Sequence, residues 1–170
     1  MAPWWTLLLF ISTLFASGRA DVPSLNDALT ANANLSSFQS LLTTQFPDLL
    51  KQLGAADSSN PITLCAPSND AFNNMQYSSV IGTAWANNDS IVIGNILNYH
   101  VIPGEHTSQT LDGSFQFLPT LLTDKSLTSV SGGQRVGAVL QGGEPPLVVF
   151  VSGLSTRSVV LQEDIAFTGG

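Results

Sequence analysis

The feature that most constrains the fold is a change of hydrophobic period near Gly104 in this chain of 170 residues. Before Gly104, apolar side chains recur at helical spacing, as in Phe38, Leu41 and Leu42. After it, apolar and polar residues alternate in short segments that glycine-containing turns separate. Helices followed by hairpins predict an α+β fold, with helices packed on an antiparallel sheet.

Local signals predict where the helices begin and end. Ser24 is a typical N-cap for the first helix, and Ser36 with Gln39 matches a capping box for the second. Pro47 opens a third helix, and Gly54 closes it. The expected helices cover residues 24–31, 36–45, 48–53 and 91–98, with a further helical turn after Pro67.

Strands are predicted mainly in the second half of the chain. One short buried strand is expected in the first half, at residues 61–66. Apolar and polar side chains alternate there, and prolines flank the segment. Residues 117–122, FLPTLL, are expected to form a short helix or a hydrophobic plug between strands. The other expected strands are residues 106–111, 127–130, 135–140, 147–151 and 158–162.

The first 20 residues are expected to be a signal peptide. Trp4–Phe15 is apolar and uncharged, but it is shorter than the roughly 20 residues that span a membrane. Gly18 and Ala20 are small residues at the positions that precede a cleavage site. The remaining residues, 21–170, are long enough to bury one core, so we expect a single secreted domain.

Composition argues against several partners and sites. The chain has 5 Lys and Arg against 12 Asp and Glu, a net charge of −7, so it lacks the cationic surface that binds nucleic acid or anionic lipid. The single cysteine, Cys65, forms no disulfide framework or CxxC site, and in a buried strand it acts as a small hydrophobe. His100, Glu105 and an exposed His106 are too few ligands for a zinc site. We expect no metal and no other cofactor.

No catalytic motif is present in the sequence. GxSxG, GxGxxG and GxxxxGK[ST] are all absent. Glu163 and Asp164 are adjacent, so in a strand they would face opposite sides of the sheet. We therefore expect no enzyme. The alternative is a secreted hydrolase of polysaccharides, since its two carboxylates can be distant in sequence.

Four segments resemble, in order, the segments of a fasciclin domain, especially in secreted fungal members. They are TLCAPSNDAF at 63–72, NYHVIPG at 98–104, LPTLLTD at 118–124 and SVVLQEDIAFTGG at 158–170. The resemblance extends over about residues 23–170 and implies a fasciclin-like fold, in which helices pack on an antiparallel wedge or sandwich. The family pattern continues beyond Gly170 into a final strand, so we expect a domain that is truncated at its C-terminus and lacks this strand.

The residues of these motifs are expected to have mainly structural roles. Ser68 is placed to cap the next helix, and Asp70 lies where a carboxylate meets the positive end of the helix dipole. Phe72 is expected to anchor the core. The resemblance marks Ala66, Pro67, Ser68, Asn69, Asp70, Phe72, Pro103, Gly104 and Asp164 as motif residues.

Tyr99 and His100 form the motif that the resemblance associates with adhesion and with integrin contact. One interpretation places His100 on an inner helix face with Ile96 and Leu97, hydrogen-bonded to buried backbone. In the other, Tyr99 and His100 belong to a surface where the neighbouring loop contacts a partner. The residues themselves leave both interpretations open.

The resemblance implies a secreted, non-catalytic module for cell adhesion or matrix interaction, at the cell surface or in the cell wall. Its expected partners are cell-surface or matrix proteins, or glycans. Asn34 and Asn88 begin N-glycosylation sequons. The residues encode no C-terminal apolar tail for a GPI anchor, so we expect no membrane anchor within them. Besides the hydrolase, a purely structural cell-wall glycoprotein is the remaining alternative.

Overall fold

The computed structural model describes residues 21–75, 81–153 and 155–170, and the expected signal peptide at 1–20 lies outside them. The helices are α1 (Leu25–Ala31), α2 (Ser36–Thr44), α3 (Pro47–Leu53), α4 (Asn69–Met75), α5 (Ile81–Ala86) and α6 (Ser90–Tyr99), with 3₁₀ turns η1 (Ala33–Leu35) and η2 (Ser108–Thr110). The strands are β1 (Ile62–Leu64), β2 (Val101–Pro103), β3 (Gln116–Pro119), β4 (Arg135–Gln141), β5 (Leu147–Val151) and β6 (Arg157–Val159). This order confirms the α+β prediction.

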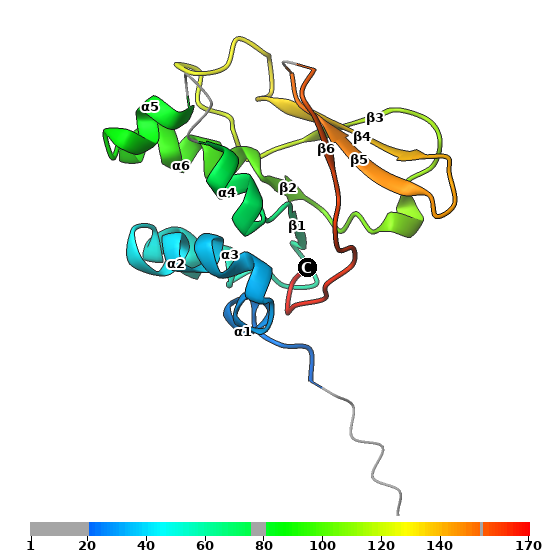
Figure 1. Ribbon diagram of the computed structural model, residues 1–170, viewed down its shortest axis with the longest axis horizontal. Coiled ribbons are helices and arrows are strands. Elements are labelled where there is room, and N and C mark those ends of the chain that lie inside the picture. The colour runs from blue at the N-terminus through cyan, green and yellow to red at the C-terminus, as the bar shows by residue number, and fades with distance from the viewer. Residues whose placement is uncertain (1–20, 76–80, 154) are drawn as a thin grey trace, which may run out of the picture.

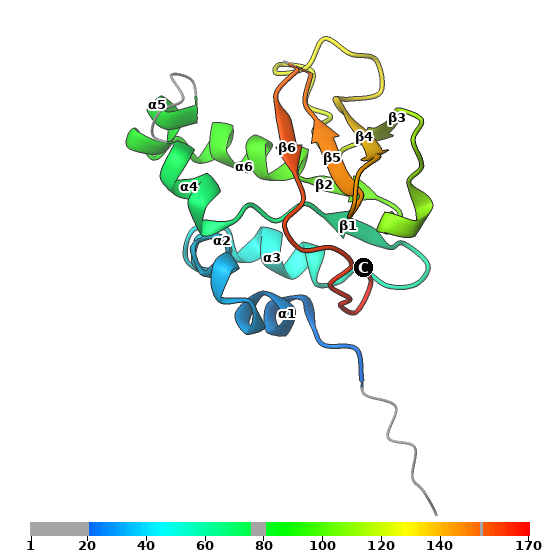
Figure 2. The same ribbon diagram turned by 45° about the vertical axis from the view of Figure 1, so that its right-hand side comes forward.

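The strands form two antiparallel sheets. β1 pairs with β2, with Thr63 opposite Ile102, and β3, β4, β5 and β6 pair in sequence order in a four-stranded sheet. In Figures 1 and 2, the helices lie on one side of the β1–β2 ribbon and the four-stranded sheet on the other. The ribbon is therefore the middle layer of the domain, as expected for helices packed on an antiparallel wedge.

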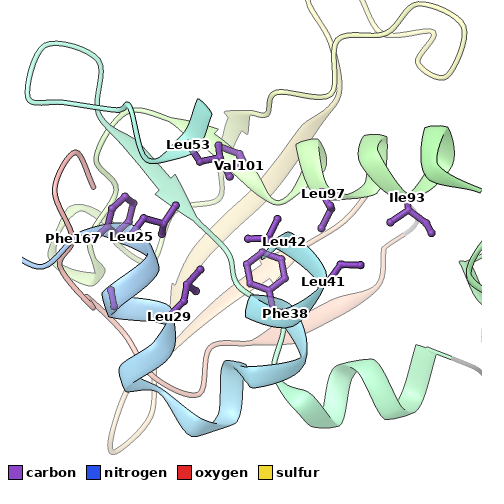
Figure 3. Packing of buried hydrophobic residues seen from close by; sticks show 11 residues of the cluster. Leu25, Leu29, Phe38, Leu41, Leu42, Leu53, Ile93, Leu97, Val101 and Phe167 are labelled. Atoms are coloured by element: carbon purple, nitrogen blue, oxygen red, sulfur yellow. The ribbon is translucent and has the colours of Figure 1, made fainter. Parts of the chain in front are cut away.

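The helices enclose the first of two hydrophobic clusters, which we call the helical cluster (Figure 3). The amphipathic spacing of α2 turns Phe38, Leu41 and Leu42 inward, and Ile93 and Leu97 of α6 meet them. The buried members of the helical cluster are Leu25, Ala28, Leu29, Phe38, Leu41, Leu42, Leu53, Ile93, Leu97, Val101 and Phe167.

The second cluster, the sheet cluster, fills the space between the ribbon and the four-stranded sheet. Val101 and Ile102 are neighbours in β2 and are both 0% exposed, but Val101 belongs to the helical cluster and Ile102 to the sheet cluster. Successive side chains of a strand point to opposite faces, so one strand contributes to both cores. The buried members of the sheet cluster are Ile102, Leu111, Leu118, Val136, Ala138 and Val148.

Several local predictions are confirmed. The Ser24 hydroxyl accepts a hydrogen bond from the Asp27 amide at 3.2 Å and caps α1. Pro47 begins α3, and Gly54 follows its last residue. β4 and β5 fall on the expected strands at 135–140 and 147–151.

The capping box expected at Ser36 is wrong. α2 begins with Ser36 inside the helix, and the residue before it, Leu35, makes no side-chain cap. The Ser37 amide instead donates to Asn69 Oδ1, 2.9 Å away, on the first residue of α4. A side chain from a distant segment therefore performs the task that the sequence pattern assigned to a neighbour.

The strand predictions also need correction. Residues 117–122 form no helix, because residues 116–119 pair as edge strand β3 with β4. Residues 106–111 contain the turn η2 instead of a strand. Residues 127–130 form turns, because Asp124 accepts from the Ser126 and Thr128 amides and folds the chain back. The last expected strand is shorter and shifted, at 157–159.

Candidate functional site

The first motif forms the corner between β1 and α4. The Ser68 hydroxyl accepts from the Ala71 amide at 3.2 Å, and Asp70 lies in the first turn of α4, as the sequence predicted. Phe72 is half-buried, with its ring 6.5 Å from that of Phe38 and 5.6 Å from that of Trp85. The motif therefore attaches α4 to the helical cluster.

The Asn69 side chain makes three hydrogen bonds to residues around the start of α2. Its Oδ1 accepts from the Ser37 amide at 2.9 Å, and its Nδ2 donates to the Ala33 carbonyl and to Ser36 Oγ, each at 3.0 Å. One amide side chain thus closes the turn before α2 and caps that helix. No short-range sequence signal could reveal this contact, which joins residues more than 30 positions apart.

Tyr99 joins α6 to one end of the four-stranded sheet. Its hydroxyl donates to the Arg135 carbonyl at 3.2 Å and accepts from the Gly153 amide at 3.4 Å. Its ring packs against the sheet cluster, and burial raises the pKa of the phenol. Tyr99 therefore holds the beginning of β4 close to the end of β5.

His100 is partly buried beside Tyr99, with the two ring centroids 6.4 Å apart. Its Nδ1 lies 2.8 Å from the Ile96 carbonyl, and its own carbonyl accepts from the Cys65 amide. Burial lowers the pKa of the imidazole, since the charged form loses more solvation than this hydrogen bond restores. The neutral ring with Nδ1 protonated fits this geometry.

Pro103, Gly104 and Asp164 organise the loop that follows β2. Gly104 has φ of 95° and donates its amide to the Pro61 carbonyl at 2.8 Å. Asp164 accepts from the Ser108 amide at 2.9 Å and from the Ser108 hydroxyl at 2.7 Å, which fixes η2. Asp164 lies beyond β6 with φ of 54°, outside any strand, so the strand alternation considered for Glu163 and Asp164 does not apply to them.

His106 and Cys65 have local packing roles. His106 is half-buried, not exposed as expected, because its ring covers Gly104 and its Nε2 lies 3.2 Å from the Pro103 carbonyl. Cys65 packs against the sheet cluster, and burial raises the pKa of its thiol to about 12. Within residues 21–75, 81–153 and 155–170, no group of three or more His, Cys, Asp or Glu side chains could hold a metal ion.

Both sequons lie on the surface of the described domain. Asn34 is exposed in η1, and Ser36 of its sequon accepts the hydrogen bond from Asn69. Asn88 is exposed with φ of 49° just before α6, whose N-cap is Asp89. Each asparagine side chain is accessible to solvent, and glycan occupancy at these positions stays a prediction.

A hollow lies away from all of these motif residues, on the outer face of the four-stranded sheet. It has a volume of about 430 Å³, and its lining includes Phe115, Val139, Val149, Val151 and Arg157. A second hollow of about 550 Å³ lies in the loop at residues 123–133. None of the motif residues lines the first hollow. Its signal was the unbroken apolar run LVVFV at 147–151, which leaves both faces of β5 apolar.

The motif residues thus define a class of protein: an α+β domain in which the motifs hold the scaffold together. The sequence matches the fasciclin domain over residues 33–170, so the chain belongs to the fasciclin family. The recognition made from the four motif segments is confirmed. Fasciclin domains are interaction modules of the extracellular space or cell surface, and the family is generally non-catalytic.

Two curated fungal proteins are similar to this chain. A fasciclin-like arabinogalactan protein of Arthroderma benhamiae is 28% identical over 114 residues, which cover 67% of this chain and 26% of that protein. The fasciclin-like arabinogalactan protein elcF of Phaeosphaeria nodorum is 28% identical over 156 residues, 88% of this chain and 46% of that protein. The chain spans less than half the length of either relative.

In the part of the chain that the structure describes, no helix is both long and apolar enough to cross a membrane.

Proposed function

We propose that this chain is a secreted adhesion module that binds proteins or glycans of the cell surface or matrix and catalyses no reaction. The observation that supports it best is the internal use of the motif side chains. Ser68, Asn69, Tyr99 and Asp164 all donate or accept hydrogen bonds within the domain. Their task is to hold a rigid scaffold, which leaves binding to the surface that the scaffold presents.

The lining of the two hollows also favours binding over hydrolysis. Their side chains are apolar, hydroxyl, amide or basic. Glycoside hydrolysis uses a pair of carboxylates on either side of the scissile bond. The fungal relatives are named arabinogalactan proteins, which supports a place among the glycoproteins of the cell surface or wall.

An adhesion assay with the purified domain tests this proposal. Immobilised domain is expected to retain fungal cells, and an excess of soluble domain is expected to compete with it. Heat-unfolded domain is the matched control for nonspecific retention. Equal retention by folded and unfolded protein would contradict the proposal, and so would release of reducing sugars from cell-wall polysaccharide by the purified domain.

A further inference from the structure

The two faces of the four-stranded sheet carry different sets of side chains. Leu118, Val136, Ala138 and Val148 point inward and belong to the sheet cluster. Within each strand, the residues next to these inward ones point outward, because successive side chains of a strand face opposite sides of the sheet. The outer face consists of the outward side chains of β3 to β6 together with Phe115.

Strand pairing arranges the outer face in rows across the sheet. One row runs from Phe117 through Gly137 and Val151 to Arg157, because each is the register partner of the next. The row beside it joins Val139, Val149 and Val159 in the same way. The first row therefore begins with an aromatic ring and ends with a cation. The second row consists of valines, of which Val149 is buried at its centre and Val159 is 38% exposed at the sheet edge.

An aromatic pair stands at one edge of this face. Phe117 is 66% exposed and Phe115 is 48% exposed, and their ring centroids lie 5.4 Å apart. The Phe115 ring lies over Gly137, where a Cβ atom would collide with it. Gly137 thus makes room for the ring, and the hollow of about 430 Å³ extends from Phe115 to Arg157.

Both arginines of the described residues lie on this sheet, although the chain has a net charge of −7. The Arg135 guanidinium donates to the Phe117 carbonyl at 3.2 Å, and the Arg157 guanidinium donates to the Gln141 side chain. These partners are neutral, so each guanidinium keeps donors and its full charge for a carboxylate from outside.

We propose that the outer face docks a partner protein through a segment that carries a large apolar side chain next to a carboxylate. The apolar side chain occupies the hollow between Phe115 and Arg157, and the carboxylate binds Arg157. Aromatic and arginine side chains are enriched in protein–protein interfaces, and here they surround aliphatic valines. This inference rests on the proposed function and names the surface that performs it.

Charge decides against a second copy of the chain in the same place. A two-fold contact through this face would bring Arg135 and Arg157 of both copies together, and like charges in an interface oppose association. A glycan is also a poorer match, because valine and phenylalanine side chains offer no hydrogen bonds to sugar hydroxyls. A protein segment supplies both the apolar group and the carboxylate.

A pair of synthetic peptides tests the chemistry of the site. The probe is a blocked hexapeptide with one phenylalanine between two aspartates, and its match has lysines in place of the aspartates. The isotope-labelled domain is titrated with each peptide and followed by NMR. The acidic peptide is expected to change the amide chemical shifts of Val139, Val149 and Val151. The lysine peptide is expected to bind at least about tenfold more weakly, the factor that one charge-assisted hydrogen bond supplies.

Two variants and a control locate the interaction. Arg157→Gln is expected to weaken binding of the acidic peptide about tenfold, and Phe117→Ser is expected to weaken it severalfold. Both variants are expected to keep the wild-type NMR spectrum away from the substituted residue. Lys51→Gln removes an exposed cation on α3, away from the outer face, and is expected to leave binding unchanged. Equal binding of both peptides, or equal effects of Lys51→Gln and Arg157→Gln, would overturn the proposal. Sedimentation that shows dimers in the wild type and monomers in Arg157→Gln would overturn it in favour of self-association.

The adhesion assay separates this inference from the proposed function. Loss of cell retention in Arg157→Gln and Phe117→Ser, but not in Lys51→Gln, supports both. If all three variants retain cells as the wild type does, the outer face is not the docking surface and the adhesion function stands. If the wild type itself retains no cells, the proposed function fails, whatever the peptides show.

Discussion

The two hydrophobic clusters on either side of β2 are closed to different degrees. The helical cluster receives side chains from α1, α2, α3, α6, β2 and the C-terminal segment, which surround it (Figure 3). The sheet cluster is covered by a single layer of strands, whose other face forms the outer face. The part of the domain around the helical cluster, the helical half, therefore uses its apolar residues for stability. The part around the sheet cluster, the sheet half, divides its apolar residues between the buried cluster and the outer face.

Exposure follows the same division. Among the large hydrophobic side chains that are exposed in the described residues, only Val22 and Ile91 come before Gly104. The others follow Gly104, in or near the four-stranded sheet, and are Phe115, Phe117, Leu127, Val130, Leu147, Val159 and Leu161. Phe115, Phe117, Leu147 and Val159 belong to the outer face, and apolar side chains that share one face of a domain favour a site of interaction.

The largest expected effect comes from truncating one buried side chain in each cluster. Leu42→Ala in the helical cluster and Ile102→Ala in the sheet cluster each remove a side chain that is 0% exposed. Each is expected to lower the free energy of unfolding by about 2–5 kcal/mol, since a cavity adds to the lost burial. Urea unfolding followed by circular dichroism measures this. A single transition in both variants would show that the clusters unfold together, and two transitions in Ile102→Ala would show that they do not.

A smaller loss is expected when the helical half loses its long-range cap. Asn69→Ala removes three hydrogen bonds to the turn before α2 and to α2 itself. The expected cost is about 1–2 kcal/mol in the free energy of unfolding. Asn74→Ala, an exposed position of the same helix, is the control and is expected to cost less than about 0.5 kcal/mol. Equal costs for the two variants would show that the cap does not stabilise the domain.

Stability is expected to depend on pH because of His100, which lies where α6 meets β2. Its pKa in the folded domain is below the ordinary value of 6.5, whereas in the unfolded chain it is near that value. Below pH 6.5 the unfolded chain therefore binds the proton more readily, and the folded domain loses stability as the pH falls. Urea unfolding between about pH 7.5 and pH 5.5 measures this loss. His100→Gln is expected to flatten the slope and His106→Gln to retain it. A flat wild-type profile would contradict the prediction.

The smallest effect on stability is expected on the outer face. Phe117→Ser changes a side chain that is 66% exposed, so the free energy of unfolding is expected to change by less than about 0.5 kcal/mol. Thermal unfolding of the variant measures it. A cost above about 2 kcal/mol would mean that the aromatic pair belongs to the core of the sheet half, and it would remove the contrast between the two faces.

Sequence reasoning succeeded where a structure depends on neighbouring residues. The caps at Ser24 and Ser68 join residues three positions apart, and the ends of α3 follow from the backbone limits of Pro47 and Gly54. The strands at 135–140 and 147–151 were recognisable from their composition and their glycine turns. The family could be recognised from short motifs for the same reason, since each is a local unit of the chain.

Sequence reasoning failed where a distant partner decides. Residues 117–122 have an apolar pattern that suits a helix or a strand, and the open edge of β4 selects the strand. Ser36 has the sequence pattern of a cap, but the side chain of the distant Asn69 caps α2 instead. Asp164 finds its partner in Ser108, 56 positions earlier, so no local pattern could reveal it.

The amino-acid sequence by itself determined the α+β order, most helix ends and the family, because these depend on interactions within a few residues. Only the tertiary structure decided that Val101 and Ile102 serve different cores and that the outward rows of β3 to β6 form an apolar face with Arg157 at its edge. The reason is geometric. A strand's alternation specifies two faces, but the elements that pack against it decide which of them is buried.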